Sequence, residues 1–193
     1  MPITYANRKA QTYYLCRGFT RTGKPRYYFA REPKGDVVEK IPDGYQVQES
    51  VNGIVSLARI RPSLLSNEEI AAVEAAVQNH SQAKRYRVSV KSNQITVHER
   101  VGLDMAETAV ILGIVLSSNA LARYDDNRGQ YQPIMRFTLT DSARRLFKAE
   151  RMCFRASIDG WIDIEYDQRL PLLSAKYVPT LGTDEFFELY YGM

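Results

Sequence analysis

Alternating polar and apolar positions, many of them aromatic, fill the first sixty residues and predict β-hairpins. Gly23 lies between two aromatic-rich stretches and provides the backbone freedom that a turn requires. Asn52-Gly53 divides a second pair of alternating stretches, and both of its residues tolerate positive φ angles. We therefore expect residues 1–61 to form a small β-meander. The predicted strands are 11–18, 26–31, 45–49 and 54–58.

The pattern changes to a helical one after Pro62. Ser66 precedes Glu69 by three residues, which is the spacing of a capping box, and apolar residues then recur every three or four positions. A serine hydroxyl and a glutamate carboxylate at this spacing satisfy the free N–H groups of a helix start. The sequence therefore predicts a helix over residues 67–79.

A second capping pattern begins a strongly apolar stretch. Asp104 and Glu107 have the same spacing, and the residues that follow predict a helix over 105–123. Because this stretch is apolar nearly all round, we expect it to be central and buried. Its β-branched residues leave a buried strand as the alternative, although its length favours a helix.

The rest of the chain mixes short strands and helices. A hairpin at 86–90 and 95–98, strands at 134–140 and 161–166, a loop at 125–129, and helices at 170–177 and 184–190 are predicted. Residues 142–156 fit a helix or a strand. The expected fold class is α+β, with a β-rich region at 1–61 followed by a mixed region at 62–193. The two regions are either separate domains or parts of one core.

Composition narrows the setting. The 193-residue chain is 45% hydrophobic and 25% charged, as in globular proteins. It begins without a secretion signal, and its longest apolar run is too short to cross a bilayer, so we expect a cytoplasmic protein with no membrane association. Cys16 and Cys153 are far apart and lack the close ligand spacing of zinc sites with His80 or His98. We therefore expect no disulfide, no metal and no cofactor.

Charge is distributed in blocks although the net charge is only +4. Residues 1–34 hold eight Lys or Arg and one acid, whereas residues 158–193 hold two Lys or Arg and seven acids. Basic blocks fall at 8–31, 84–100 and 144–155. Such blocks either converge on a phosphate-binding surface or pair with the acidic blocks inside one fold.

The first candidate site is the N-terminal hairpin, in which aromatic residues interleave with cations. Aromatic rings stack on bases while Arg and Lys contact phosphates. The alternative is a sheet in which Tyr serves only as a strand residue. The candidate nucleic-acid-binding residues here are Arg17, Arg21, Lys24, Arg26, Tyr28 and Arg31.

The second candidate depends on residues 142–156 being helical. Four cations would then line one helix face, which suits a phosphate backbone or is a solvated surface. Glu150 would lie on the apolar face of that helix, and if the segment is a strand the basic stripe does not exist. The four cations are Arg144, Lys148, Arg151 and Arg155.

We therefore expect a nucleic-acid-binding protein without catalytic activity, contacting DNA or RNA mainly independently of sequence, as a subunit of a larger nucleic-acid-processing assembly. One alternative is a metal-dependent nuclease that uses Asp159, Asp163 and Glu165, because grouped carboxylates can hold Mg²⁺. On a strand, Asp163, Glu165 and Asp167 would share one face. A second alternative is an adaptor whose basic hairpin docks an acidic protein partner. No phosphate loop, dinucleotide fingerprint or nucleophile elbow occurs in the sequence.

Overall fold

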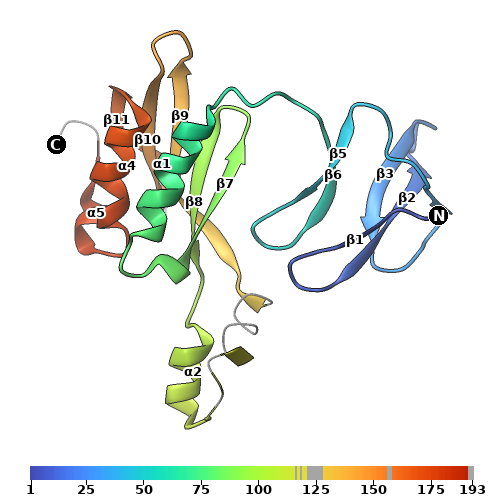
Figure 1. The fold of residues 1–193 in the computed structure, drawn as a ribbon, viewed down its shortest axis with the longest axis horizontal. Helices are drawn as coiled ribbons and strands as arrows, with labels where there is room; N and C mark the ends of the chain where they lie inside the picture. The colour runs from blue at the N-terminus through green and yellow to red at the C-terminus, as the bar shows by residue number, and fades with distance from the viewer. Residues whose placement is uncertain (116, 118, 121–127, 156–157, 191–193) are drawn as a thin grey trace. The chain divides into compact units, whose positions relative to one another are not determined.

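The computed structural model describes residues 1–115, 117, 119–120, 128–155 and 158–190 (Figure 1). It contains antiparallel sheets in the N-terminal part and a mixture of strands and helices in the rest, which confirms the predicted α+β class. The chain divides into two compact units. Unit 1 comprises residues 1–61 and 102–130, and unit 2 comprises residues 62–101 and 131–193.

Unit 1 is built from two antiparallel sheets. Its strands are β1 (Thr4–Ala6), β2 (Thr12–Phe19), β3 (Pro25–Ala30), β4 (Asp36–Val37), β5 (Tyr45–Glu49) and β6 (Val55–Arg59). β2 pairs with β3 along one edge and with β1 and β4 along the other, and β5 pairs with β6. Both predicted hairpins of the N-terminal region are confirmed.

Polar side chains tie the two sheets of unit 1 together. The hydroxyl of Tyr5 donates to the Glu49 carboxylate at 3.0 Å, and the backbone N–H of Arg8 donates to the same carboxylate at 2.9 Å. The buried amide of Asn7 donates to the Gly53 carbonyl in the β5–β6 turn at 2.6 Å. Leu15 and Cys16, which point to opposite faces of β2, are both fully buried. The base of the β2–β3 hairpin is therefore fixed on both faces.

Helix α2 (Met105–Leu112) differs from its prediction. Its capping box between Asp104 and Glu107 is present, but the helix ends at Gly113, which has a left-handed φ of 64°. The prediction of a helix continuing to residue 123 is wrong for the described residues, since a glycine in this conformation terminates a helix. Residues 121–123, like most of the predicted loop at 125–129, lie outside the described chain. The expectation of a buried position is also wrong, because Val110 is 82% exposed.

Unit 2 is a five-stranded antiparallel sheet with helices packed against it. The strands are β7 (Tyr86–Lys91), β8 (Gln94–Arg100), β9 (Tyr131–Asp141), β10 (Leu146–Arg155) and β11 (Ile158–Gln168). Their order in the sheet, β11-β10-β9-β8-β7, follows the order along the chain. The helices are α1 (Asn67–Gln78), η1 (Ala83–Arg85), α4 (Leu170–Tyr177), η2 (Val178–Thr180) and α5 (Asp184–Glu188).

The core of unit 2 lies between one face of this sheet and helices α1 and α4 (Figure 1). Val73 and Val77 of α1 and Leu173 of α4 are buried against sheet residues such as Phe137 and Phe147. Ser66 caps α1 and forms the predicted capping box with Glu69. The predicted hairpin at 86–98, the strands at 134–140 and 161–166, and the helices near 67, 170 and 184 are all confirmed.

Residues 146–155 form strand β10, so the helical interpretation of this segment is wrong. Phe147 and Ala149 are fully buried, while the intervening Lys148 is partly exposed, which is the two-residue alternation of a strand. β10 pairs with β9 on one side and with β11 on the other, and these backbone hydrogen bonds stabilise the strand conformation. Within the described residues, no helix is long and apolar enough to span a membrane.

Candidate nucleic-acid interface

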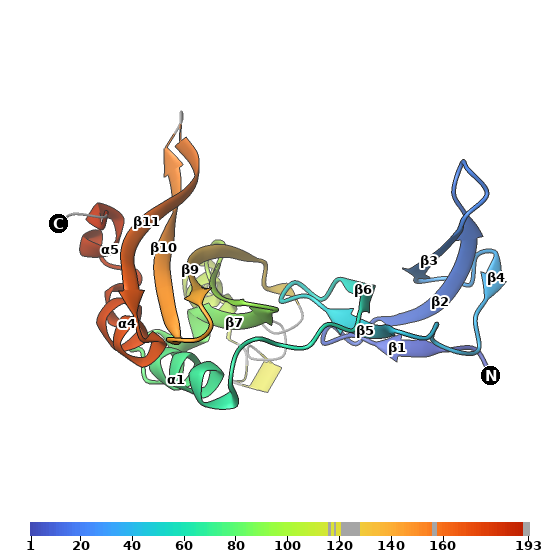
Figure 2. The ribbon, with the colours of Figure 1, turned by 90° about the horizontal axis from the view of Figure 1, so that it is seen from above.

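The β2–β3 hairpin extends beyond its neighbouring strands. β1 pairs with residues 12–14 of β2 and β4 pairs with residues 16–17, so residues 18–26 form a two-stranded ribbon and its loop (Figure 2). Gly18 lies opposite Arg26, and Phe19 lies opposite Pro25. We call residues 19–26 the hairpin tip.

Hydrogen bonds brace the loop of the hairpin tip. The Thr20 N–H donates to the Lys24 carbonyl at 2.8 Å, and the Gly23 N–H donates to the Thr20 carbonyl at 2.9 Å. The Lys24 N–H also donates to the Thr20 hydroxyl, which lies 3.0 Å from the Thr22 hydroxyl. Gly23 has a φ of 76°, a conformation that glycine adopts without strain. The loop therefore has a defined shape.

The cations of the tip are exposed. Within the described chain, Arg21, Lys24 and Arg26 make no ion pair and no side-chain hydrogen bond. Phe19, beside them, is 66% exposed. Because these side chains lie in water and form no ion pair within the described chain, a ligand can contact them without first breaking such a pair. The tip thus combines an aromatic surface with cations that no acid of the described chain neutralises.

The other candidates on this hairpin are engaged at its base. Arg17 forms an ion pair with Asp36 at 3.1 Å, and Arg31 donates to the Gln11 side chain at 3.3 Å. The hydroxyl of Tyr28 donates to the Lys34 carbonyl at 3.1 Å, and the ring lies over Gly18, where an added Cβ would be 3.4 Å from it. These residues support the hairpin, and Tyr28 shares the face of Arg26 because Cys16 and Gly18 are their partners on β2.

Of the four cations of the second candidate, the three whose side chains the structure describes do not lie together. Arg144 is exposed in the β9–β10 turn, whereas Lys148 donates to Glu150 and to Asp163, both at 3.0 Å. Arg151 points to the opposite, buried side of β10 and donates to the Leu189 carbonyl at 2.5 Å. The side chain of Arg155 lies outside the described part of the structure. The predicted basic stripe is therefore absent from β10 as far as residue 151.

The carboxylates predicted to share one strand face are separated by a β-bulge. Asp163 lies opposite Glu150, but Glu165 lies opposite Ala149 on the helix-covered face, because the register shifts between these pairs. Glu165 accepts hydrogen bonds from Lys176 and Tyr177 of α4. No group of three metal-ligating side chains occurs among the residues that the structure describes, and the Asp159 side chain lies outside them.

A polar network that the sequence did not predict covers the face of the unit 2 sheet opposite the helices. Arg136 donates twice to the carboxylate of Glu150, at 2.6 Å each, and its guanidinium lies 4.2 Å from the centre of the Trp161 ring. Thr138 donates to the same carboxylate at 3.2 Å. We call this set, with Lys148 and Asp163, the salt-bridge face. Its cations are neutralised by carboxylates at contact distance.

Ionisation at the salt-bridge face follows from these contacts. Burial acts to raise the pKa of the Glu150 carboxyl, but the hydrogen bonds and charges of Arg136 and Lys148 outweigh it and lower the pKa below its ordinary value. Asp163 behaves in the same way, since burial is outweighed by hydrogen bonds from Tyr166 and Lys148. Both carboxylates are therefore held charged by the hydrogen bonds and cations around them.

The cysteines and histidines have structural surroundings. Cys16 in unit 1 and Cys153 in unit 2 are free and buried. His80 Nε2 lies 3.1 Å from the Leu181 carbonyl and its ring meets Tyr86 edge-on. His98 Nε2 lies 2.9 Å from the Ser89 hydroxyl, and burial lowers the pKa of this imidazole.

The fold and the hairpin tip define an α+β protein with a projecting cationic ribbon. No protein-family model, curated protein or solved structure matches the chain. The argument for its function therefore depends on side-chain geometry.

Proposed function

We propose that this protein binds nucleic acid through the hairpin tip, by contacts that are mainly independent of sequence. The observation that carries the proposal is the set of three exposed cations, Arg21, Lys24 and Arg26, without acidic partners in the described chain, on a hydrogen-bonded loop beside an exposed Phe19. Among the other candidate basic residues whose side chains the structure describes, none is both exposed without an acidic partner and next to an exposed aromatic ring.

The chemistry of the tip suits a phosphate backbone. Each cation that contacts a phosphate releases condensed counterions, which is the main source of affinity in contacts that do not read sequence. A two-stranded β-ribbon fits the major groove of a duplex, and an exposed aromatic ring stacks on unpaired bases. Backbone contacts carry no sequence code, so the proposal includes no preferred sequence.

The braced loop supports this function energetically. A flexible loop would lose conformational entropy on binding, whereas the hydrogen bonds at Thr20 and Gly23 fix the loop beforehand. The engaged residues Arg17 and Tyr28 hold the base of the same ribbon. The hairpin thus has a supporting base and a binding tip, and a place in a larger nucleic-acid-processing assembly is part of the proposal.

The test measures affinity for labelled single-stranded and duplex oligonucleotides over a range of salt concentrations. Replacing Arg21, Lys24 and Arg26 together with Ala should weaken binding and reduce the slope of log K against log salt by about 0.9 per lost duplex phosphate contact. The matched control replaces the exposed Lys34, Lys40 and Lys84 with Ala, which removes the same charge elsewhere. Equal losses in both triple variants, or no binding at low salt, would refute the proposal.

The same variants separate nucleic acid from an acidic protein partner. A protein partner of the tip would be retained on immobilised wild-type protein after nuclease treatment of the sample and lost from the triple variant. Nucleic-acid binding by the tip predicts that purified oligonucleotide alone is retained. The nuclease alternative predicts cleavage with Mg²⁺ that is lost in Asp163→Asn.

A further inference from the structure

Strand β7 forms one edge of the unit 2 sheet. β8 pairs with one side of β7, and no strand of the described chain pairs with the other side. The strand is six residues long, contains no proline, and pairs with β8 without a register shift. Proline and bulges are two of the devices that protect exposed edges from pairing, and β7 has neither.

The outward backbone groups of β7 belong to Tyr86, Val88 and Val90, and the Tyr86 N–H already donates to the Ala83 carbonyl. Lys91 and Gln94 flank the two-residue turn at Ser92 and are therefore a hydrogen-bonded pair. Hydrogen-bonded pairs alternate along an antiparallel ladder, so Ser89 and Arg87 also face β8. The N–H and C=O groups of Val88 and Val90 point away from it, and no backbone partner exists for them in the described chain.

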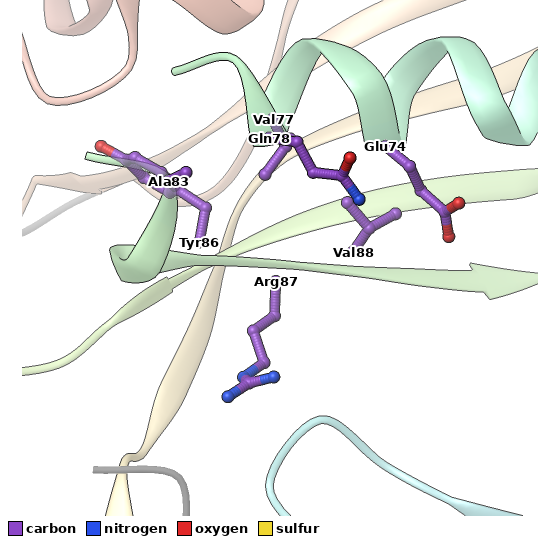
Figure 3. Close-up of a pocket in the computed structure, with 7 residues that line it drawn as sticks. All are labelled: Glu74, Val77, Gln78, Ala83, Tyr86, Arg87 and Val88. Carbon is purple, nitrogen blue, oxygen red and sulfur yellow. The ribbon is translucent and has the colours of Figure 1, made fainter. Parts of the chain in front are cut away.

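A groove runs between this edge and helix α1. The cavity has a volume of about 330 Å³ and is lined by residues of α1 and β7 and by Ala83 of η1. Figure 3 shows Glu74 and Gln78 extending from α1 toward β7, above Val88. Val77 and Val88 supply an apolar floor, and Arg87, whose side chain extends from β7 on the side away from α1, is also among the lining residues.

The polar groups over the groove define the side chain that would fill it. Glu74 and Gln78 are exposed and have no hydrogen-bond or ion-pair partner within the described residues. A lysine or arginine entering the groove would cover Val88 with its methylene groups and place its charge against Glu74. An acidic side chain in the same place would be repelled by the Glu74 carboxylate.

We propose that the groove between β7 and α1 binds an extended peptide segment of a partner protein, which adds a sixth strand to the sheet and places a basic side chain against Glu74. The main-chain groups of Val88 and Val90 would supply affinity, and the groove would supply specificity, as in other cases of strand addition. This site lies in unit 2 and is independent of the nucleic-acid contacts proposed for the hairpin tip.

Charge argues against a second copy of this chain as the occupant. If two β7 strands paired antiparallel through Val88, Lys91 of each copy would lie opposite Arg85 of the other. Like charges directly across a ladder are destabilising. A register centred on Val90 would overlap only a few residues before the turn at Ser92. A partner strand with a basic side chain facing the groove meets neither difficulty.

The experiment selects from a displayed library of random heptapeptides on the full-length protein. Wild-type protein should enrich peptides with Lys or Arg at one position among β-branched neighbours. Glu74→Lys should change that preference to Asp or Glu. The control is Glu68→Lys, which makes the same charge change on an exposed residue in the first turn of α1 and should leave the wild-type preference unchanged.

Hydrogen exchange locates the bound peptide. The most enriched synthetic peptide should slow exchange of the Val88 and Val90 amides at least tenfold, and it should bind equally well to the variant lacking Arg21, Lys24 and Arg26. No enrichment, the same preference in wild type and Glu74→Lys, or unchanged exchange at both valines would overturn the proposal. So would a dimer whose Val88 and Val90 amides are already protected without peptide, because the edge would then be occupied by a second copy.

Discussion

The hairpin tip and the salt-bridge face are both rich in arginine and lysine, yet their charges are arranged in opposite ways. At the tip, Arg21, Lys24 and Arg26 have no acidic partner in the described chain. On the salt-bridge face, Arg136 and Lys148 contact Glu150 at 2.6 and 3.0 Å. A basic block in a sequence therefore does not indicate an available charge until the cross-strand neighbours are known.

The physical difference lies in how the two sites compensate burial. The carboxylate of Glu150 is almost fully buried, and its side chain would be costly without its cations. The tip has no buried charge, so its cations stay solvated at little cost. We infer that the salt-bridge face contributes to the specificity of strand pairing, whereas binding is the role that we propose for the tip.

The largest effect is expected on breaking the salt-bridge face. Glu150→Ala removes the carboxylate that holds Arg136 and Lys148 and should lower the free energy of unfolding by about 2–3 kcal/mol, below the full penalty for a buried pair because both cations are partly exposed. Urea unfolding measures this change. The control, Glu39→Ala, alters an exposed carboxylate of unit 1 and should have little effect. Equal stability of Glu150→Ala and wild type would show that the network contributes nothing.

The next effect concerns the tip alone. Phe19→Ala should weaken binding of single-stranded oligonucleotides by about 1–2 kcal/mol through lost stacking, and should affect duplex binding less. The free energy of unfolding should stay near the wild-type value, since Phe19 is 66% exposed. Fluorescence anisotropy with both oligonucleotides measures the difference. A parallel loss of stability and of duplex affinity would instead make Phe19 a structural residue.

Local patterns predicted most of the secondary structure. Ser66 and Glu69 predicted the start of α1, and the alternation around Gly23 and Asn52-Gly53 predicted two hairpins. These predictions succeeded because each signal depends only on residues a few positions apart. The failure at α2 has a local cause as well, since Gly113 interrupts the apolar stretch and ends the helix. Burial of that run could not be inferred from its composition alone.

The site was predicted only in part because its contacts join distant residues. The pairing of Arg136 with Glu150 depends on the register of β9 against β10, and the separation of Asp163 from Glu165 depends on a bulge against β10. Neither is visible in a single strand. The cations of the hairpin tip were predicted because a tight turn places them at its end by local geometry.

A fall in pH should weaken the salt-bridge face. Glu150 has a pKa lowered by Arg136 and Lys148, and Asp163 has a pKa lowered by Tyr166 and Lys148, so the folded state binds these protons less tightly than the unfolded state. Their stabilising effect is complete above the unfolded pKa values and is lost as pH falls through the lowered folded values. Glu150→Gln should flatten the acid limb of a plot of stability against pH. An acid limb identical to that of wild type would remove Glu150 from this explanation.

The smallest effect should come from the loop of the tip. Gly23 has a φ of 76° and no atom near the position of an added Cβ, so Gly23→Ala introduces backbone strain of about 1 kcal/mol without a steric clash. The strain should loosen the loop that presents Arg21 and Lys24 and should weaken oligonucleotide binding by less than about tenfold, with the salt slope nearly unchanged because the cations remain.

Gly160→Ala is the control, since Gly160 also has open space around it but no positive φ and lies in β11. Because the two substitutions add the same methyl group, a loss of affinity confined to Gly23→Ala would show that the shape of the tip, as well as its charge, contributes to binding. Equal affinities of the two variants would leave charge as the sole contribution of the tip.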